Sequence, residues 1–225
     1  MIDWQAVDTV LLDMDGTLLD LHFDNYFWLT HLPQRYAEAR GIPLAAANAE
    51  LHAHIRAYEG TLQWYCLDHW STLVEMDIPK LKMEVRHKIQ LRPHSEAFLQ
   101  RLRAAGKKVI LITNAHPAGL KIKLEVTQID RWLDIVISSH QYQQPKEELA
   151  FWQQLHAQEN FDPARTVFFD DTPRILRSAQ TFGVAHLVCV NQPDMQKPPC
   201  RSDEFIDICH FDEIMPDEIS DKISE

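Results

Sequence analysis

Five short runs of apolar residues occur along the chain, and polar residues do not alternate with the apolar ones inside them. β-branched residues are common in these runs, and each run is four to six residues long. This pattern is typical of parallel strands that are buried on both faces. We therefore predict strands over 9–12, 109–113, 135–138, 166–169 and 185–190.

Helical patterns precede the second, fourth and fifth of these strands. Residues 95–105 gather apolar side chains on one face and are followed by Gly106, a residue type that commonly ends helices. Residues 147–158 and 173–181 have a similar spacing. This alternation of strands and helices predicts an α/β fold with a doubly wound, Rossmann-like parallel sheet.

The segment between the first two predicted strands is organised differently. Residues 21–92 contain almost no strand signal, and helical spacing recurs through them. The segment is too long for a single crossover helix, so we interpret it as an inserted α-helical cap subdomain. Its helices are predicted over 26–40, 45–58, 62–76 and 80–89.

The rest of the chain is predicted to form a core, residues 1–20 and 93–200, and a tail. Beyond Pro193 the strand and helix pattern decays, and acidic residues become frequent. Residues 201–225 are therefore expected to form an acidic C-terminal tail, within which 205–215 can pack back on the core.

The overall charge is acidic, with 22 Lys and Arg against 33 Asp and Glu, a formal net charge of −11. Such a surface repels nucleic acids and anionic membranes, so we expect neither as a partner. The sequence contains no apolar run of membrane-spanning length and no basic, apolar start typical of a signal peptide. Its four cysteines form no CxxC pair. We interpret them as reduced thiols of a cytoplasmic protein.

The sharpest chemical signal is Asp13-Met14-Asp15-Gly16-Thr17-Leu18, directly after the first predicted strand. Two carboxylates at this spacing point the same way and repel each other unless a cation or a shared proton lies between them. Mg²⁺ is a suitable cation because it takes oxygen ligands and retains several waters. The structural alternative is a surface hairpin turn, for which Asp-Gly is also typical. A buried parallel strand ahead of the turn argues against that alternative.

This stretch resembles motif one of the haloacid dehalogenase superfamily. The other motifs of that superfamily are found in order: Thr113-Asn114, Pro145-Lys146 and Asp170-Asp171. Pro145-Lys146 departs from many members, which place the proline after the lysine. The resemblance covers about residues 7–20 and 93–192, and the 21–92 insert lies where members with an α-helical cap carry theirs. It implies a sheet with the strand order 5-4-1-2-3.

The resemblance also implies residue roles. Asp13 would be the nucleophile that forms an aspartyl-phosphate, and Asp15 would act as general acid and then general base. Dehalogenating members lack this second aspartate, so its presence favours phosphoryl transfer. Lys146 would offset the charge on Asp13 and the phosphoryl group, while Thr113 and Asn114 would bind phosphate oxygens.

A Mg²⁺ cofactor would be held by the Asp13 carboxylate, the Asp15 backbone carbonyl and Asp171, with Asp170 acting through water. The sequence leaves open which member of the Asp170-Asp171 pair contacts the metal. Taken singly, these residues also have structural interpretations. Thr113 could end a strand, Lys146 could be a solvated charge, and the acidic pair could cap a following helix.

The cap is expected to select the substrate. Asp24 and Asn25 lie close to motif one in sequence and are candidates to bond a base edge or a ribose, while cap aromatics either stack on a nucleobase or form the core of the cap. The stretches 17–25, 143–148 and 168–173 resemble bacterial GMP/IMP nucleotidases, which implies hydrolysis of purine nucleoside 5′-monophosphates. The alternatives are a phosphatase for phosphoglycolate, a sugar phosphate or pyridoxal phosphate, a phosphomutase, and a non-enzymatic binding protein.

Overall fold

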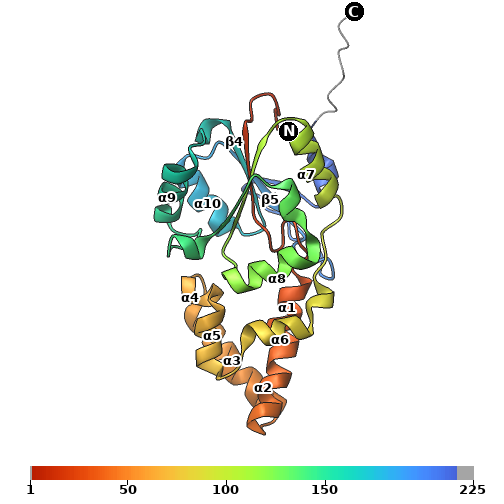
Figure 1. Ribbon diagram of the computed structural model, residues 1–225, viewed down its shortest axis with the longest axis vertical. Coiled ribbons are helices and arrows are strands. Elements are labelled where there is room, and N and C mark those ends of the chain that lie inside the picture. The colour runs from red at the N-terminus through yellow and green to blue at the C-terminus, as the bar shows by residue number, and fades with distance from the viewer. Residues whose placement is uncertain (1, 217–225) are drawn as a thin grey trace, which may run out of the picture.

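A single six-stranded parallel sheet forms the centre of the protein in a computed structural model, which describes residues 2–216 (Figure 1). The sheet order is β3-β2-β1-β4-β5-β6. Its first five strands confirm the five predicted ones to within one residue at each end, and the predicted order is also confirmed. The strands are β1 (Thr9–Leu12), β2 (Lys108–Thr113), β3 (Ile135–Ser138), β4 (Thr166–Asp170), β5 (His186–Val190) and β6 (Ile206–Ile208).

Both faces of the sheet are buried, as the continuous apolar runs require. Along β1, Val10 and Leu12 pack into one apolar cluster and Leu11 into the other. Helix α7 (Ser95–Ala104) covers the first face, and helices α9 (Leu149–Glu159) and α10 (Pro173–Phe182) cover the second (Figure 1). The result is the doubly wound α/β core that the sequence predicts.

The C-terminal segment predicted as an acidic tail takes part in the core. Strand β6 pairs in parallel with β5, and a short 3₁₀ helix, η6 (Phe211–Ile214), follows it. The ring of Phe211 is fully buried and stacks on Phe98 of α7, with ring centroids 4.4 Å apart. The remainder of the predicted tail, residues 217–225, lies outside the described residues.

Helix α8 (Pro117–Thr127) was not among the helices that the sequence pattern predicts. His116 caps its N-terminus by accepting a hydrogen bond from the Ala118 N–H, and Pro117 occupies the first helical position, where its missing N–H costs nothing. The helix lies at the end of the sheet that faces the cap (Figure 1). It therefore places its side chains between the core and the cap.

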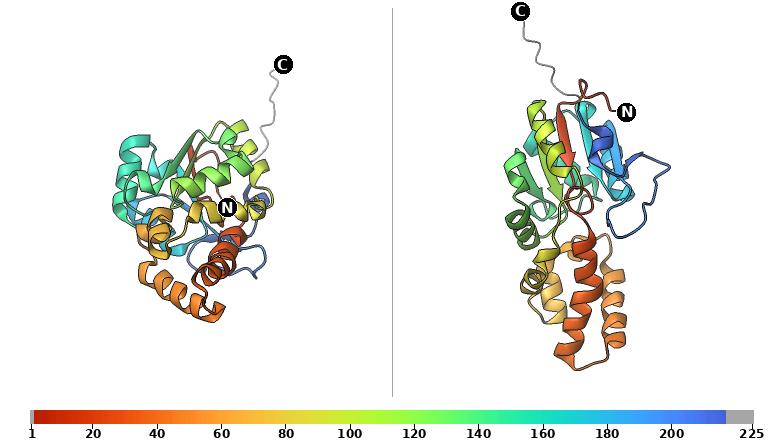
Figure 2. Two further views of the ribbon diagram at one scale, coloured as in Figure 1. Left: turned by 60° about the horizontal axis from the view of Figure 1, so that its bottom comes forward. Right: turned by 90° about the vertical axis from the view of Figure 1, so that its right-hand side faces the viewer.

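The cap is helical and forms an elongated lobe beyond the carboxyl ends of the core strands (Figure 2). A π-helical turn lies immediately ahead of Pro33, which cannot donate the backbone hydrogen bond of a regular α-helix. The predicted 62–76 helix is broken at Cys66, whose backbone is extended. The helices are α1 (His22–Tyr26), η1 (Phe27–His31), α2 (Leu32–Arg40), α3 (Leu44–Tyr58), α4 (Leu62–Tyr65), α5 (Leu67–Val74), α6 (Ile78–Glu84) and η2 (Arg86–Lys88).

Two chain segments that pair with each other connect the cap to the core. The backbone N–H of Asp20 donates to the Gln90 carbonyl at 2.9 Å, and that of Arg92 donates to the Leu18 carbonyl at 3.0 Å. Ser95 fastens the same segment, since its hydroxyl donates to the Leu18 carbonyl at 2.9 Å. These two hydrogen-bonded segments position the cap over the strand ends where Asp13 and Asp15 lie.

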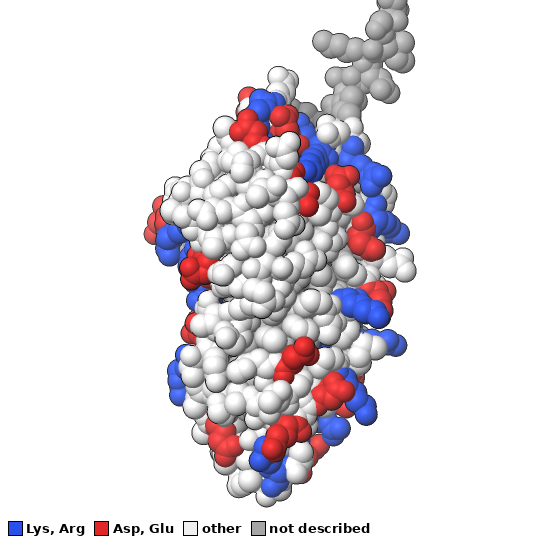
Figure 3. All heavy atoms as spheres, turned by 60° about the vertical axis from the view of Figure 1, so that its left-hand side comes forward, with Lys and Arg blue, Asp and Glu red and all other residues white. Residues whose placement is uncertain are grey.

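Charged side chains of both signs are mixed on the surface. On the face shown in Figure 3, acidic and basic groups lie mainly along the margins, and the middle of the face carries few of either. The net charge of −11 is therefore not gathered into one acidic patch there. Within residues 2–216, no helix combines the length and the apolar character that crossing a membrane requires.

Candidate active site

The first functional element is the turn that follows β1. The Met14 carbonyl accepts hydrogen bonds from the Leu18 and Leu19 N–H groups, which folds residues 14–19 into a compact loop. Gly16 has a φ of +86°, and a Cβ atom there would lie 2.7 Å from Oδ2 of Asp171. Only glycine fits this position without strain, because it tolerates positive φ and leaves room for the carboxylate.

Lys146 lies at the centre of the site and is almost fully buried. Its Nζ is 2.6 Å from Oδ1 of Asp13 and 2.7 Å from Oδ2 of Asp170, and it also donates to the Ile112 carbonyl at 3.3 Å. Burial opposes its charge, but the two carboxylates prevail and raise the pKa of Lys146. The ammonium group is therefore held as a permanent cation between two acids from neighbouring strands.

Three carboxylates of the site converge. Oxygen atoms of Asp13, Asp170 and Asp171 lie within 4.8 Å of one another. Burial raises the pKa of Asp13 to about 6, and the nearby Asp170 adds to the effect against the opposing charge of Lys146. Burial and the neighbouring Asp170 and Asp13 also raise the pKa of Asp171 well above its usual range. Such mutual repulsion among oxygen ligands is relieved by a divalent cation, so this donor set fits Mg²⁺.

The two acids at the end of β4, Asp170 and Asp171, differ in how they are engaged. Asp170 has both oxygens occupied, one by Lys146 and the other by the Thr172 backbone N–H at 2.8 Å. Asp171 receives a longer hydrogen bond, 3.2 Å, from the Thr172 hydroxyl. Asp171 is therefore the freer ligand of the pair.

Thr113 and Asn114 lie at the end of β2, where both are buried. Oγ1 of Thr113 accepts a hydrogen bond from the Ala115 N–H at 3.0 Å. Asn114 Oδ1 accepts from the backbone N–H of Lys146 at 2.9 Å, and its Nδ2 donates to Glu147 at 2.9 Å. Asn114 thus ties the end of β2 to the loop that carries Lys146.

Glu147 extends this network to the cap. Its Oε1 accepts a hydrogen bond from the Tyr65 hydroxyl at 2.8 Å and lies 3.3 Å from a guanidinium nitrogen of Arg174. Burial, together with Glu147, raises the pKa of Tyr65, so the phenol stays protonated as the donor. This is a direct polar contact between the cap and the core at the rim of the site.

A second chain of buried charges joins Asp15 to the cap. Nζ of Lys123, on α8, lies 2.6 Å from Oδ1 of Asp15 and 2.7 Å from Oδ2 of Asp24. The other oxygen of Asp24 lies 2.7 Å from Nζ of Lys82, on α6. Burial alone would raise the pKa of Asp24, but Lys123 and Lys82 hold that pKa well below its usual range. Burial raises the pKa of Asp15 to about 6, opposed by Lys123 and supported by Asp24 and Asp13.

The sequence did not single out Lys123 or Lys82, because an isolated lysine is usually a solvated charge. A weak signal exists for Lys123, which follows the apolar Ile122 and precedes the apolar Leu124. Its burial, however, depends on Asp15 and Asp24, which lie about a hundred residues earlier in the chain.

The two cap residues named from the sequence are both engaged in polar contacts. The carboxylate of Asp24 is shared by Lys82 and Lys123, as described above. Nδ2 of Asn25 donates to Oδ2 of Asp194 at 2.7 Å, and Asp194 belongs to the segment after β5. Both residues line the cavity next to Asp13 and Asp15.

A cavity of about 320 Å³ lies between the cap and the strand ends, a size that accommodates a small metabolite. Its floor carries the carboxylates and Lys146, and its cap wall is rich in indole and phenol rings. Trp28 and Trp70 lie in contact with ring centroids 5.0 Å apart, and Trp64 and Tyr65 with centroids 4.9 Å apart. The cap aromatics that line this cavity are Trp28, Trp64, Tyr65 and Trp70. Tyr58 packs instead on His69 and Trp70.

The family assignment follows from comparison with known proteins. The sequence profile described as haloacid dehalogenase-like hydrolase matches residues 7–183, most of the chain. The chain belongs to the haloacid dehalogenase-like hydrolase family. A protein named GMP/IMP nucleotidase YrfG, from Escherichia coli (strain K12), is 42% identical over 193 residues, which cover 86% of this chain and 87% of that protein. A protein of the same name from Shigella flexneri matches equally well.

Solved structures of haloacid dehalogenase-like proteins share the fold. A HAD phosphatase from Thermococcus onnurineus superposes with a TM-score of 0.79 at 21% identity, covering 92% of this chain and 95% of that one. YfnB from Bacillus subtilis, a HAD-hydrolase described as bound to magnesium, gives a TM-score of 0.65 at 17% identity, covering 92% and 96%. As a member of this hydrolase family, the protein is an enzyme, and a non-enzymatic role is not supported.

We expect Lys123→Met to lower both stability and turnover. The variant leaves Asp15 without its ion-pair partner, and unpairing a buried charge costs roughly 3 kcal/mol. Because the same lysine orients Asp15, kcat should fall at least about tenfold. Urea unfolding and phosphate release from p-nitrophenyl phosphate measure the two effects.

Lys121→Met is the matched control for this prediction. Lys121 is exposed on the same helix and lies 3.9 Å from Glu125, so its loss should change stability by less than about 0.5 kcal/mol. A Lys123→Met protein with wild-type kcat and wild-type unfolding would show that the Asp15–Lys123 pair has no role in the site.

Proposed function

We propose that the protein is a Mg²⁺-dependent phosphomonoesterase that hydrolyses purine nucleoside 5′-monophosphates such as GMP and IMP. The observation that carries the proposal is the cavity itself, in which Asp13, Asp15 and Lys146 face an aromatic cap wall. The 42% identity to a GMP/IMP nucleotidase over most of both chains supports the same substrate class. The proposed substrate is a small phosphorylated metabolite, and we expect the enzyme to act in the cytoplasm without a nucleic-acid partner.

In the first proposed step, a carboxylate oxygen of Asp13 attacks the phosphorus atom of the substrate. The bond from phosphorus to the ester oxygen breaks, and that oxygen takes a proton from Asp15. The products are the free nucleoside and an aspartyl-phosphate on Asp13. Lys146 lies 2.6 Å from Oδ1 of Asp13, so its charge is in place to stabilise the negative charge of the transition state.

In the second step, Asp15 takes a proton from a water molecule, and the water oxygen attacks the phosphorus of the aspartyl-phosphate. The bond from phosphorus to Asp13 breaks, which releases inorganic phosphate and restores both aspartates. Thr113 and Asn114, at the end of β2, are proposed to position the phosphate oxygens. Positioning and charge stabilisation provide most of the catalysis in this reaction class.

The carboxylates of Asp13 and Asp171 and the backbone carbonyl of Asp15 are proposed to hold Mg²⁺, with Asp170 bonded through a water molecule. When bound, the metal supplies positive charge beside the transferred phosphoryl group. The engagement of Asp170 by Lys146 and Thr172 supports this division, because it leaves Asp171 as the freer carboxylate.

The cap is proposed to recognise the purine. Trp28 and Trp64 offer flat apolar surface to a base, and Asn25 offers a polar group. Because both oxygens of Asp24 are engaged by lysines, its proposed contribution is to hold Lys82 and Lys123 in the cavity wall. The aromatic side chains favour a substrate with an aromatic base, and the two lysines favour one with an anionic group.

A phosphate-release panel tests the substrate class. With Mg²⁺ present, we expect kcat/KM for GMP and IMP to exceed that for glucose 6-phosphate and phosphoglycolate by at least about tenfold, because these two substrates have no aromatic ring to stack on the cap wall. Pyridoxal phosphate, which has a smaller aromatic ring, tests whether the wall prefers a purine. AMP and UMP measure base preference. Trp64→Ala should reduce the rates on GMP and IMP while leaving the rate on phosphoglycolate nearly unchanged.

Two results would overturn the proposal. Equal or better rates on the sugar phosphates would remove the nucleotide assignment and leave a phosphatase of another substrate class. An isomerised phosphate ester in place of free inorganic phosphate would identify a phosphomutase.

A further inference from the structure

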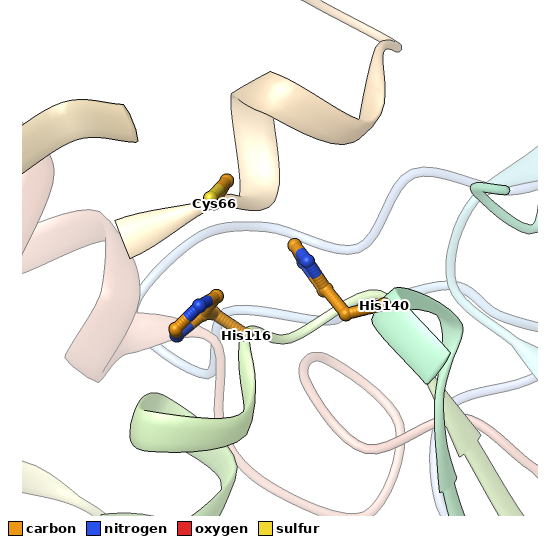
Figure 4. Close-up of side chains that lie close together, drawn as sticks. All are labelled: Cys66, His116 and His140. Carbon is orange, nitrogen blue, oxygen red and sulfur yellow. The ribbon is translucent and has the colours of Figure 1, made fainter. Parts of the chain in front are cut away.

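A cysteine and two histidines meet at the junction of the cap and the core, outside the carboxylate site. Cys66 lies in the break between α4 and α5 of the cap, His116 follows β2, and His140 lies in the 3₁₀ helix η4 (Ser139–Gln141) that follows β3. Their sulfur and ring-nitrogen atoms can be chosen so that all lie within 4.8 Å of one another. Figure 4 shows the three side chains arriving from separate segments of the chain.

We propose that Cys66, His116 and His140 form a binding site for a soft divalent transition metal such as Zn²⁺, and that the bound metal fastens the cap to the core. A thiolate with two imidazoles is a donor set that prefers zinc-like ions, whereas Mg²⁺ prefers the all-oxygen set of Asp13, Asp170 and Asp171. The two sites therefore differ in the metals that they select.

The spacing suits a tetrahedral ion. With Zn–S and Zn–N bonds near their usual lengths, ligand atoms around zinc lie roughly 3.5 Å apart. The three atoms, which now lie within 4.8 Å of one another, must move closer together to bind the ion. The rings of His116 and His140 already lie with centroids 5.0 Å apart and nearly perpendicular planes, so they do not stack face to face.

His140 is prepared as a ligand. Its Nε2 is buried and has no hydrogen-bond partner within the part of the chain that the structure describes. A buried ring nitrogen that has no protein partner and lies beside a cysteine and a second histidine is available to bind a metal.

The groups around the other two ligands are also favourable. Sγ of Cys66 accepts a hydrogen bond from the His69 N–H at the start of α5, a contact that suits a thiolate. For His116, Nε2 lies 3.5 Å from Oδ2 of Asp68, where an N–H can point to the carboxylate, so Nδ1 is the nitrogen left for the metal. Nδ1 now accepts a 3.3 Å hydrogen bond from the Ala118 N–H, which metal binding would replace. The exposed Asp68 carboxylate adds a second negative charge to that of the thiolate, which together match a divalent cation.

A metal bound at this site would restrict movement of the cap relative to the core. Cys66 moves with the cap, while His116 and His140 belong to the core, so a metal bonded to all three fixes one lobe to the other. His116 also lines the cavity that holds Asp13 and Lys146. If exchange of substrate and product requires the cap to open, the bound metal will slow turnover. This inhibition rests on the proposed hydrolase activity, whereas metal binding does not.

Binding is tested on the full-length protein after removal of metals with a chelator. We expect one Zn²⁺ per chain in competition with a chromophoric chelator, and a thiolate-to-metal charge-transfer band when Co²⁺ is added. Cys66→Ser should lose the band and weaken binding at least about tenfold, while serine preserves the helix cap. His140→Gln should weaken binding similarly. Cys200→Ser and His52→Gln, at exposed positions, are the matched controls and should bind as the wild type does.

The two halves of the proposal can fail separately. Binding in the Asp13→Asn variant should equal that of the wild type, since the site does not depend on turnover. In excess Mg²⁺, Zn²⁺ should inhibit phosphate release from the wild type more strongly than from Cys66→Ser, and any inhibition common to both reflects the carboxylate site. Equal metal affinity of the wild type and Cys66→Ser would overturn the site. Intact binding with equal inhibition of both would overturn the fastening of the cap.

Discussion

Asp13→Asn is expected to reduce phosphate release at least about 10⁴-fold while the protein still folds. The amide oxygen of asparagine cannot replace the carboxylate as a nucleophile, so no aspartyl-phosphate forms. Folding should survive because asparagine has the same shape and Lys146 keeps its second partner, Asp170, at 2.7 Å. Stability should change by no more than about 1 kcal/mol, since the substitution removes one of several mutually repelling buried acids.

Steady-state phosphate release, urea unfolding and mass spectrometry of acid-quenched enzyme measure these effects. The wild type should show a phosphoryl adduct on the peptide that contains Asp13, and the variant should show none. Asp8→Asn is a suitable control, because Asp8 precedes the same strand and its exposed carboxylate pairs with Arg165 at the surface. Turnover by Asp13→Asn above about 1% of the wild-type rate would refute the assignment of the nucleophile.

Lys146→Met is expected to lose both activity and stability. Methionine fills a similar volume but leaves the carboxylates of Asp13 and Asp170 buried without their shared cation. Breaking a buried ion pair in this way costs roughly 3–5 kcal/mol. The loss of a fixed positive charge beside the transferred phosphoryl group should lower kcat by about 10²–10³-fold.

The stability measurement is made with and without Mg²⁺, after removal of metals with a chelator. Mg²⁺ bound by the native state should restore part of the lost stability, because a cation that binds only the folded protein stabilises it. Lys121→Met, at an exposed position, should unfold like the wild type. If metal-free Lys146→Met is as stable as metal-free wild type, the Asp13–Lys146–Asp170 cluster does not contribute to stability as described here.

The sequence by itself determined the five central strands and their parallel arrangement. Apolar runs such as Thr9–Leu12 can be read locally because a strand covered on both faces is apolar at every position. The turn after β1 is also encoded locally, since Gly16 supplies the positive φ and the room that Asp171 requires. Motif order then indicated which strand ends would meet, so Asp13, Thr113, Lys146 and Asp171 could be named together.

Other elements could not be read from local pattern. Helix α8 contains Leu120, Ile122, Leu124 and Val126 at alternating positions, a spacing more typical of a strand than of a helix. Strand β6 is only three residues long and forms because the edge of β5 is available for pairing. Both depend on neighbours that are brought close only by folding.

Residues of the site that follow strand ends could be predicted from the sequence, whereas residues brought in by other helices could not. The motif residues follow strand ends, whose meeting point is a property of the doubly wound sheet. Lys123 and Lys82 reach the candidate active site only because α8 and α6 bring them to Asp15 and Asp24. Cys66, His116 and His140 likewise gather only where the cap meets the core. A run of apolar residues predicts a buried strand from the local sequence. Which distant charges and metal ligands come together is decided by the tertiary structure.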